Sequence, residues 1–333
     1  MGGDFAPVET VKGAVWAASD NIEITLVGSE NIIRKELSNY NITNLPIHIV
    51  NASEVIHYNE PPVEALRQKP DSSIAVSIRL VKEAAADAMV SMGPTGAIMA
   101  CAKEVLGMLP GIRRPVMGGK LMGYAPHTVV FDMGANVDCR PQQLLGFGVF
   151  GCAAIRAMYD IANPTVAILS NGGEATRGNR LVKETYVLLQ NSGMNFIGSI
   201  EANEIPSGKA NVIVCDGFTG NALIKLSEGL GQAIVRYLET RLRGQVPDSE
   251  IQSIGAEIIT ATNVADYQGG GMLYGVDGVI VKGHGRYKAR ELNNAIHYAS
   301  TLVQKHLVKA IKSELAKYES KMNDNMPTPQ TDE

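Results

Sequence analysis

The chain has 333 residues, of which 45% are hydrophobic and 19% charged, so it can bury a large core and has the length of about two domains. Its formal net charge is −4 and it has no block of basic residues, which argues against a dedicated nucleic-acid-binding protein. We find no signal-peptide pattern and no apolar run of about 18 residues, so we expect a cytoplasmic rather than a membrane-spanning protein.

Four cysteines are scattered along the chain at positions 101, 139, 152 and 215. They form no CxxC pair and show no zinc-ligand spacing, which favours buried free thiols in a reducing compartment. Cys139 and Cys215 adjoin polar motifs, so a reactive thiol remains an alternative at these two positions.

Short apolar runs alternate with helical patterns along the chain. The runs bounded by Gly, Asn or Asp suit strands that are buried on both faces. Expected strands cover Ile22–Val27, Ile47–Asn51, Ala88–Met92, Thr128–Met133, Thr165–Ser170, Asn195–Ile200, Val212–Cys215 and Val279–Val281. Expected helices cover Val8–Ser19, Ser73–Ala86, Gly96–Met108, Gln143–Tyr159, Gly178–Gln190, Gly220–Arg243 and Glu291–Lys317. This alternation predicts a doubly wound, mostly parallel α/β sheet in three layers.

The first residues, MGGDFAP, form a glycine turn that leads into a helix. Such a turn normally follows a strand, and the sequence shows none before it. We therefore expect the true start to lie upstream, with an internal methionine taken as the start, or the first strand to have been lost. Asp4 is a candidate binding residue because Gly2 and Gly3 let backbone amides approach a ligand. Capping of the helix by Asp4 is the alternative.

A second glycine turn, Gly93–Gly96, follows the expected strand Ala88–Met92. The helix after it offers N–H groups and a partial positive charge, so Thr95 is a candidate contact for a phosphate or a carboxylate. An ordinary strand–helix turn fits equally well. Arg113 and Arg114 then stand in a loop bounded by Gly and Pro; Arg113 is a candidate phosphate ligand, and surface charge is the alternative.

The stretch FDMGANVDCRP, Phe131–Pro141, is the most informative in the chain because it crowds polar residues against a strand end. Ligands of open α/β sheets bind just beyond the carboxyl ends of strands. Asp132, Asn136 and Asp138 could bind a metal, orient a ligand or support the loop. No ligand spacing demands a metal, so we predict none.

Two similar stretches follow, SNGGEATRGN (Ser170–Asn179) and VCDGFTGNALIK (Val214–Lys225). Their candidate site residues are Asn171, Glu174, Arg177, Asn179, Asp216, Thr219, Asn221 and Lys225. In the first stretch, opposite charges could instead pair with each other. In the second, Asp216 could simply cap a helix that carries a solvated lysine.

The C-terminal third adds one further candidate site residue. His284 is flanked by glycines after the strand Val279–Val281, which makes it a site candidate rather than a structural histidine. We expect residues 269–276 to form a flexible glycine loop, and residues 319–333 to be a disordered polar tail. Between Ala233 and Ile259, two apolar helix faces are expected, with Ser249 and Gln252 as a capping box.

Several common enzyme motifs are absent. There is no G-x-S-x-G elbow, no P-loop and no glycine fingerprint for a dinucleotide between a strand and a helix. These absences disfavour a Ser–His–Asp hydrolase, a P-loop ATPase and an ordinary Rossmann dehydrogenase.

Seven segments together resemble the phosphate acyltransferases of bacterial phospholipid synthesis, the acyl-acyl carrier protein:phosphate transacylases. In order they are MGGDFAP, PPVEALRQKPDSSIAVSIRLVKEAAADA, FDMGANVDCRP, GNRLVKE, NFIGSIEANEI, VIVCDGFTGN and the HG of KGHG, from Met1 to about residue 310. Three features depart from that family. The strand before MGGD is absent, the turn usually written SAGNTGA reads SMGPTGA with Met92 and Pro94, and HGSS becomes HGRY.

The resemblance implies transfer of a long fatty acyl group from acyl carrier protein to inorganic phosphate, without a cofactor. The acyl phosphate would then pass to a membrane glycerol-3-phosphate acyltransferase. The implied fold is that of isocitrate and isopropylmalate dehydrogenases and phosphotransacetylases: one catalytic unit, residues 1–318, of two interleaved subdomains with a cleft between them. A homodimer is implied, with residues 233–259 as a helical projection for dimer contact and for peripheral contact with the inner face of the cell membrane.

A mechanism follows from the candidate residues. Arg177, Lys225 and the helix near Thr219 would hold phosphate, and Asn136, Asn171 or Asn221 would donate to the oxyanion. Asp132, Asp138 and Asp216 would orient these donors, and His284 would protonate the leaving thiolate. Three alternatives stay open: a phosphotransacetylase acting on short acyl-CoA, a metal- and NAD-dependent dehydrogenase of the shared fold, and a non-catalytic scaffold for lipid-synthesis enzymes.

Overall fold

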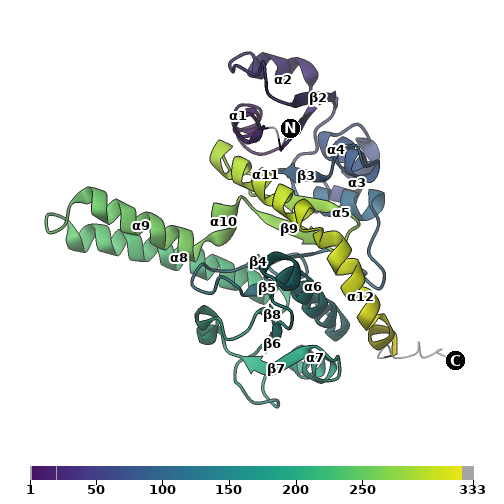
Figure 1. Cartoon of the computed structure of the whole chain (residues 1–333), viewed down its shortest axis with the longest axis vertical. Helices are drawn as coiled ribbons and strands as arrows, with labels where there is room; N and C mark the ends of the chain where they lie inside the picture. Colours follow the sequence, from purple (N-terminus) through teal and green to yellow (C-terminus); the bar gives the residue numbers. More distant parts are fainter. Residues whose placement is uncertain (1, 20, 325–333) are drawn as a thin grey trace. The chain divides into compact units, whose positions relative to one another are not determined.

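The computed structural model describes residues 2–19 and 21–324, with side chains as far as Tyr318. The chain divides into two compact units, each built from two separate stretches of sequence. The first unit comprises Met1–Leu109 and Asp266–Val308, and the second comprises Pro110–Ala265 and Lys309–Glu333. Figure 1 shows the elements of both units in sequence colours.

The first unit contains two groups of strands. Strands β1 (Ile24–Gly28) and β2 (Ile47–Asn51) form a parallel pair. Strand β10 (Val279–Lys282) pairs in parallel with β3 (Ala88–Ser91) and antiparallel with β9 (Gly271–Tyr274). The helices of this unit are α1 (Val8–Ala17), α2 (Glu30–Leu37), α3 (Pro62–Gln68), α4 (Ser73–Lys82), α5 (Thr95–Val105) and α11 (Ala289–Gln304).

The second unit has five strands in the order β4-β5-β8-β6-β7. Their bounds are β4 (Val116–Lys120), β5 (Val129–Phe131), β6 (Thr165–Leu169), β7 (Asn195–Ile200) and β8 (Val212–Val214). Strands β5, β8, β6 and β7 run parallel, and β4 lies antiparallel to β5. This confirms the prediction of a mostly parallel α/β fold.

The helices of the second unit are α6 (Pro141–Tyr159), α7 (Arg180–Gln190), α8 (Gly217–Leu242) and α9 (Asp248–Thr262), with the 3-10 turn η1 (Ala202–Ser207). Helix α10 (Val264–Gln268) contains the sequence boundary of the two units, and so does α12 (Leu307–Asp324). No helix of the described residues is both long and apolar enough to cross a membrane.

The central strands of the second unit are apolar on both faces because helices cover both. Every residue of β5 and β8 is buried. On one face packs α6, whose residues 144–155 are all buried. Gly151 allows the close approach, since a Cβ there would lie 2.2 Å from a methyl carbon of Val212. The fold therefore holds the ends of β5 and β8 rigidly.

Two strands that contain glycines, β4 and β9, were not predicted from the sequence. The predicted flexible loop at 269–276 is wrong: it contains β9, whose Met272, Leu273 and Tyr274 are buried. Strand β4, which contains Gly118 and Gly119, was not predicted. The structure requires Gly118, however, because a Cβ there would lie 2.1 Å from the ring of Phe131.

The helix predictions also need correction. Helices α2 and α3 were not predicted, and the expected single helix Glu291–Lys317 is broken at His306, whose φ of 51° interrupts the helical backbone. Helix α12 continues to Asp324, so the expected disordered tail begins too early; residues 325–333 lie outside the described residues. Helix α9 begins at Asp248 after Pro247, without a side-chain cap, so the capping box of Ser249 and Gln252 is wrong.

A buried ion pair attaches α12 to α6 in the second unit. Glu314 is 4% exposed, and its Oε2 lies 2.5 Å from Nη1 of Arg156. Arg156 also donates from Nε to the carbonyl oxygen of Ala162, 2.9 Å away. Helix α12 is thus attached to the core of the second unit.

Candidate active site

Three polar loops meet at one edge of the second unit's sheet. Strands β5, β8 and β6 are neighbours and run parallel, so their carboxyl ends lie at the same edge. The loops that follow them contain the three polar motifs of the sequence. Topology therefore brings together residues that are separated by up to about ninety positions in the chain.

The loop after β5 is organised by the carboxylate of Asp132, which is fully buried. Its Oδ1 accepts hydrogen bonds from the backbone N–H groups of Gly134 and Ala135, both at 2.9 Å. Its Oδ2 accepts from the backbone N–H of Asn136 at 2.7 Å. Burial raises the pKa of Asp132, and these N–H donors oppose the rise by stabilising the charged form.

Asn136 is 2% exposed and serves the same loop. Its Nδ2 donates to the carbonyl oxygen of Pro115 at 2.9 Å and to Oδ2 of Asp132 at 2.8 Å. An amide nitrogen has two N–H bonds, and both are used here. This geometry favours the loop-support alternative for Asn136 over a donor to substrate. Asp138 lies exposed on the same loop.

The loop after β8 begins α8 with a side-chain cap. Oδ1 of Asp216 accepts from the Thr219 N–H at 2.8 Å, and Oδ2 accepts from the Thr219 hydroxyl at 2.9 Å. The Gly217 N–H donates to the carbonyl oxygen of Asn136 at 2.7 Å, which joins this helix start to the β5 loop. Asp216 and Thr219 thus fix the start of α8. Both carboxylate oxygens of Asp216 accept hydrogen bonds from Thr219.

Asn221 and Lys225 are exposed on the second and third turns of α8. A Cβ added to Gly134 would contact Asn221, so Asn221 lies directly beside the β5 loop. Nζ of Lys225 pairs at 2.7 Å with the largely buried carboxylate of Glu228. These two side chains present polar N–H groups near the positive end of a 26-residue helix.

The loop after β6 carries the remaining candidates. Oδ1 of Asn171 accepts from the Gly178 N–H at 2.9 Å, and Oδ1 of Asn179 caps α7 by accepting from the Val182 N–H at 2.9 Å. Nε of Arg177 lies 3.3 Å from Oε2 of Glu174, so the alternative of a local charge pair is the arrangement observed. All of the candidate residues in this loop are exposed. Arg113 is also exposed, in the loop before β4.

The candidates Asp4, Thr95 and His284 belong to the first unit. The Asp4 N–H donates to the carbonyl oxygen of Gly285 at 2.8 Å, which ties the N-terminal turn to the residue after His284. Thr95 is the first residue of α5, after Pro94, and no side chain caps this helix. Tyr58, which sequence analysis missed, donates to the carbonyl oxygen of Met92 at 2.7 Å. Partial burial, and then the negative charge of Asp4, raise the pKa of Tyr58.

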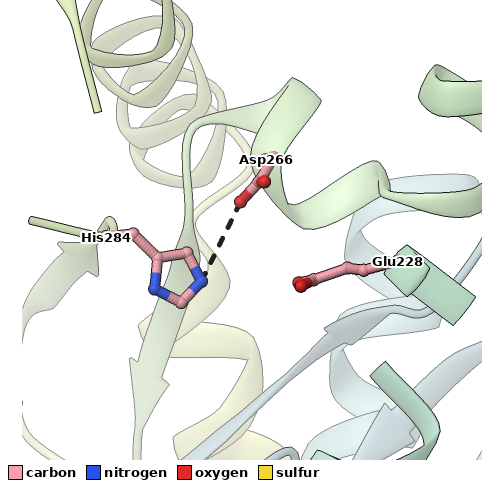
Figure 2. Close-up of side chains that lie close together, drawn as sticks. All are labelled: Glu228, Asp266 and His284. Atoms are coloured by element: carbon pink, nitrogen blue, oxygen red, sulfur yellow. Dashed lines mark ion pairs between the residues drawn. The ribbon is translucent and has the colours of Figure 1, made fainter. Parts of the chain in front are cut away.

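The imidazole of His284 faces Asp266, a second residue that sequence analysis missed (Figure 2). Nε2 of His284 lies 3.9 Å from Oδ1 of Asp266. The same carboxylate pairs with Arg286 at 2.9 Å and accepts from the Tyr287 hydroxyl. Figure 2 also labels Glu228, the partner of Lys225 in the second unit. Asp266 stands in the short helix α10 with no motif around it, so no local pattern identified it.

The cysteines near the motifs are poor nucleophiles. Burial raises the pKa of Cys139 to about 12, and that of Cys215 still further. The Sγ atoms contact carbonyl oxygens of Asn136 and Asp132, at 3.3 and 3.6 Å respectively. Since the thiolate is the reactive form, this disfavours the reactive-thiol alternative at neutral pH.

Two glycines of α8 provide a matched test of this loop–helix packing. A Cβ at Gly220 would lie 1.8 Å from the carbonyl oxygen of Asp132, whereas one at Gly229 would meet no heavy atom within 4 Å. Gly220→Ala should therefore lower the free energy of unfolding by about 2 kcal/mol or more. Gly229→Ala should raise it by up to about 1 kcal/mol, as alanine favours a helix. Urea denaturation measures both; equal effects of the two substitutions would contradict the packing described.

Comparison with known proteins gives consistent matches. Residues 1–310 match the family described as "Fatty acid synthesis protein". A phosphate acyltransferase from Clostridium tetani is 38% identical over 326 residues, which cover 96% of this chain and 97% of the relative. A phosphate acyltransferase from Dictyoglomus turgidum is 40% identical over 329 residues, covering 95% and 96% respectively.

Two solved structures share the fold at low sequence identity. A phosphotransacetylase from Streptococcus pyogenes has a TM-score of 0.59 and 19% identity, covering 89% of this chain and 91% of its own. A phosphotransacetylase from Staphylococcus aureus has a TM-score of 0.53 and 14% identity, covering 88% and 98%. At these identities the match shows the fold alone, and it confirms the α/β class expected from the sequence.

Proposed function

Because the chain belongs to the fatty acid synthesis protein family, whose curated relatives are named phosphate acyltransferases, we propose that it transfers a long-chain fatty acyl group from acyl carrier protein to inorganic phosphate. The chain is an acyltransferase, and the acyl phosphate it forms would supply a membrane glycerol-3-phosphate acyltransferase. The observation that carries the proposal is the meeting of three polar loops at the carboxyl ends of β5, β8 and β6.

Two exposed cations beside these loops suit a phosphate dianion. The side chains of Lys225 and Arg177 are 47% and 59% exposed, and each now pairs with a carboxylate. The pair of Arg177 with the exposed Glu174 contributes little in water, so phosphate can displace that carboxylate at small cost. The positive end of α8 adds to the attraction.

Acyl transfer from a thioester to phosphate depends more on positioning the two reactants than on a strong general base. A phosphate oxygen attacks the thioester carbonyl carbon, the carbonyl electrons move onto oxygen, and collapse of this intermediate breaks the C–S bond. The products are acyl phosphate and a thiolate, whose thiol has a pKa of about 8.5 if it behaves like cysteine. The enzyme gains most by stabilising the tetrahedral oxyanion.

Asn221 is the best placed donor for that oxyanion. Its amide is exposed beside the β5 loop, whereas the amide of Asn136 is consumed within it. Asp132 and Asp216 act through the backbone, by fixing the loop and the helix start. Asn171 and Asn179 support the third loop in the same way.

His284 is our candidate for returning a proton to the thiolate. The facing carboxylate of Asp266 would stabilise its charged form. Substrate contacts by Asp4, Thr95, Arg113, Asp138 and Glu174 remain predictions.

Thiol release from palmitoyl-acyl carrier protein, measured with and without inorganic phosphate, tests the function directly. We expect release that requires phosphate and that is faster with the carrier protein than with palmitoyl-CoA or acetyl-CoA. Preference for acetyl-CoA would indicate the phosphotransacetylase alternative. Binding of the carrier protein without loss of the thioester would indicate the non-catalytic scaffold. Reduction of NAD by a hydroxyacid would indicate the dehydrogenase.

The same assay tests the role of Asn221. Asn221→Ala should lower kcat for acyl transfer about 10²-fold, because one oxyanion donor is lost while the exposed site keeps its fold. Gln232→Ala, at another exposed position of α8, is the matched control and should leave kcat unchanged. A loss of less than tenfold in Asn221→Ala would remove Asn221 from the mechanism.

Helices α8 and α9 form a hairpin that extends away from the sheet of their unit (Figure 1). One side of α8 exposes Leu226, Leu230, Ile234 and Tyr237, which recur at helical spacing. We propose that this stripe is the homodimer interface. Arg236, Arg241 and Arg243 lie toward the hairpin turn and would support peripheral contact with an anionic membrane, which vesicle flotation tests.

Charges placed in the stripe should break the dimer. Leu226→Glu combined with Leu230→Glu should yield a monomer in sedimentation velocity, since each protomer would bury two carboxylates on association. Gln232→Glu adds a charge on the same helix away from the stripe, so it should leave the dimer intact. A dimer that survives the double substitution would place the interface elsewhere.

A further inference from the structure

One face of helix α1 exposes a row of large apolar side chains in the first unit. Phe5, Val8 and Trp16 are 44%, 49% and 54% exposed. Positions 5, 8, 12 and 16 are three or four residues apart, so they lie on the same face of a helix. Phe5 belongs to this row because its carbonyl oxygen already accepts from the Glu9 N–H. Apolar side chains that gather in this way mark an interaction site, whereas single ones do not.

The opposite face of α1 is buried, and it packs on α11 (Figure 1). Ala14 and Ala17 are buried there, and a Cβ at Gly13 would lie 2.6 Å from the carbonyl oxygen of Ala289, the first residue of α11. This close packing fixes the rotation of α1 about its own axis. The apolar row is therefore held on the outside of the first unit.

Two lysines add positive charge to the row. Nζ of Lys12 lies 5.0 Å from the ring centroid of Trp16, and Nζ of Lys288 lies 5.5 Å from that of Phe5. Within the described part of the chain, neither lysine forms a salt bridge. A cation over an exposed ring gains only about 0.5–1 kcal/mol, so both ammonium groups are available to a carboxylate from outside. The α1 surface consists of Phe5, Val8, Lys12, Trp16 and Lys288.

Two carboxylates of the same helices are used by backbone N–H groups. Oε2 of Glu9 accepts from the Ala289 N–H at 2.8 Å, and Oε2 of Glu291 accepts from the Lys288 N–H at 3.0 Å. They hold the start of α11 against α1 and leave the two lysines unpaired. The whole chain has a net charge of −4, so a cationic, aromatic surface stands out against the overall charge. Its charge complements an acidic partner.

The α1 surface adjoins the part of the first unit that contains His284. Phe5 follows Asp4, whose N–H donates to the carbonyl oxygen of Gly285 at 2.8 Å. The side chain of Asp4 lies on that side too, since a Cβ at Gly285 would lie 2.9 Å from its Oδ1. Gly285 directly follows His284, our candidate for protonating the leaving thiolate. A partner on the α1 surface would thus present its thioester near His284.

We propose that the α1 surface is the docking site of the acyl carrier protein, an acidic partner whose carboxylates would pair with the two lysines. The proposal rests on the proposed function, which makes the carrier protein the acyl donor. Tryptophan is enriched among the residues that dominate binding energy at interfaces, which suits Trp16 as the centre of the contact. An anionic membrane is a weaker match, because a helix that lies on a membrane is usually rich in Lys and Arg. Lys12 is the one basic residue of α1.

Trp16 is also the one tryptophan of the chain, so its fluorescence reports on this surface without a label. A tryptophan-free carrier protein that bears no acyl group should shift the Trp16 emission to shorter wavelength, because docking buries the ring. The shift should saturate with carrier protein. Added salt should weaken the binding, because it screens the lysine charges. This measurement needs no substitution and no acyl transfer.

Charge reversal tests the same surface by kinetics. Lys12→Glu combined with Lys288→Glu should raise KM for palmitoyl-acyl carrier protein at least about tenfold and leave kcat unchanged, because docking is lost and chemistry is not. A short acyl-pantetheine has no protein surface, so its kcat/KM should not change. Arg67→Glu combined with Lys103→Glu makes the same change of charge at exposed positions of α3 and α5, and should leave KM unchanged. Circular dichroism checks that both variants fold.

Three results would overturn the proposal. The first is an equal effect of the two double substitutions on KM, or an unchanged Trp16 emission with a carrier protein that the enzyme turns over. The second is an emission shift with anionic vesicles but not with carrier protein, which would make α1 a membrane-contact helix. The third is an emission that changes with enzyme concentration alone, which would make the surface a contact between two copies.

These failures differ from a failure of the proposed function. Absence of phosphate-dependent thiol release would refute acyl transfer, yet the Trp16 shift with carrier protein would still be measurable. Normal thiol release with no effect of the lysine substitutions would refute the docking site alone.

Discussion

The site of the second unit depends on one buried carboxylate. Asp132 accepts hydrogen bonds from three consecutive backbone N–H groups and so shapes the loop after β5. The carbonyl oxygen of Asn136, the last residue of that turn, then accepts from the Gly217 N–H at the start of α8. Because Gly220 leaves no room for a side chain against Asp132, the helix cannot shift without moving the loop. The exposed residues of α8 are therefore held on a rigid base.

This arrangement separates residues that support the candidate site from residues that are exposed in it. Asp132 and Asn136 are buried and use their polar atoms on the loop, while Asn221, Lys225 and Arg177 reach solvent. Sequence alone placed all five in one group because each lies beside a strand end. Only the hydrogen-bond partners distinguish a residue that supports a loop from one that is available to a substrate. These partners are known only once the chain has folded.

The parts of the fold with a strong local pattern were predictable. Strands β5, β6 and β8 are apolar on both faces. Asn179 and Asp216 are residues typical of a helix N-cap, and they mark the starts of α7 and α8. Strand β4 escaped because it contains Gly118, which looks like a loop residue but is required by close packing. Strand β9 escaped because Gly269 and Gly270, which stand against backbone atoms, directly precede it. The break at His306 and the role of Asp266 depend on contacts with residues distant in sequence, which no window of the sequence contains.

The pairing of Arg156 with Glu314 has a consequence for how the protein is made. The second unit includes α12, from the last tenth of the chain, and the first unit needs residues 266–308 to supply β9, β10 and α11. Neither unit can complete its core while the ribosome is still adding the first 265 residues. Folding of both must therefore wait until synthesis has passed well beyond residue 265. Until then the nascent protein carries exposed strand edges, and these edges are surfaces that chaperones can protect.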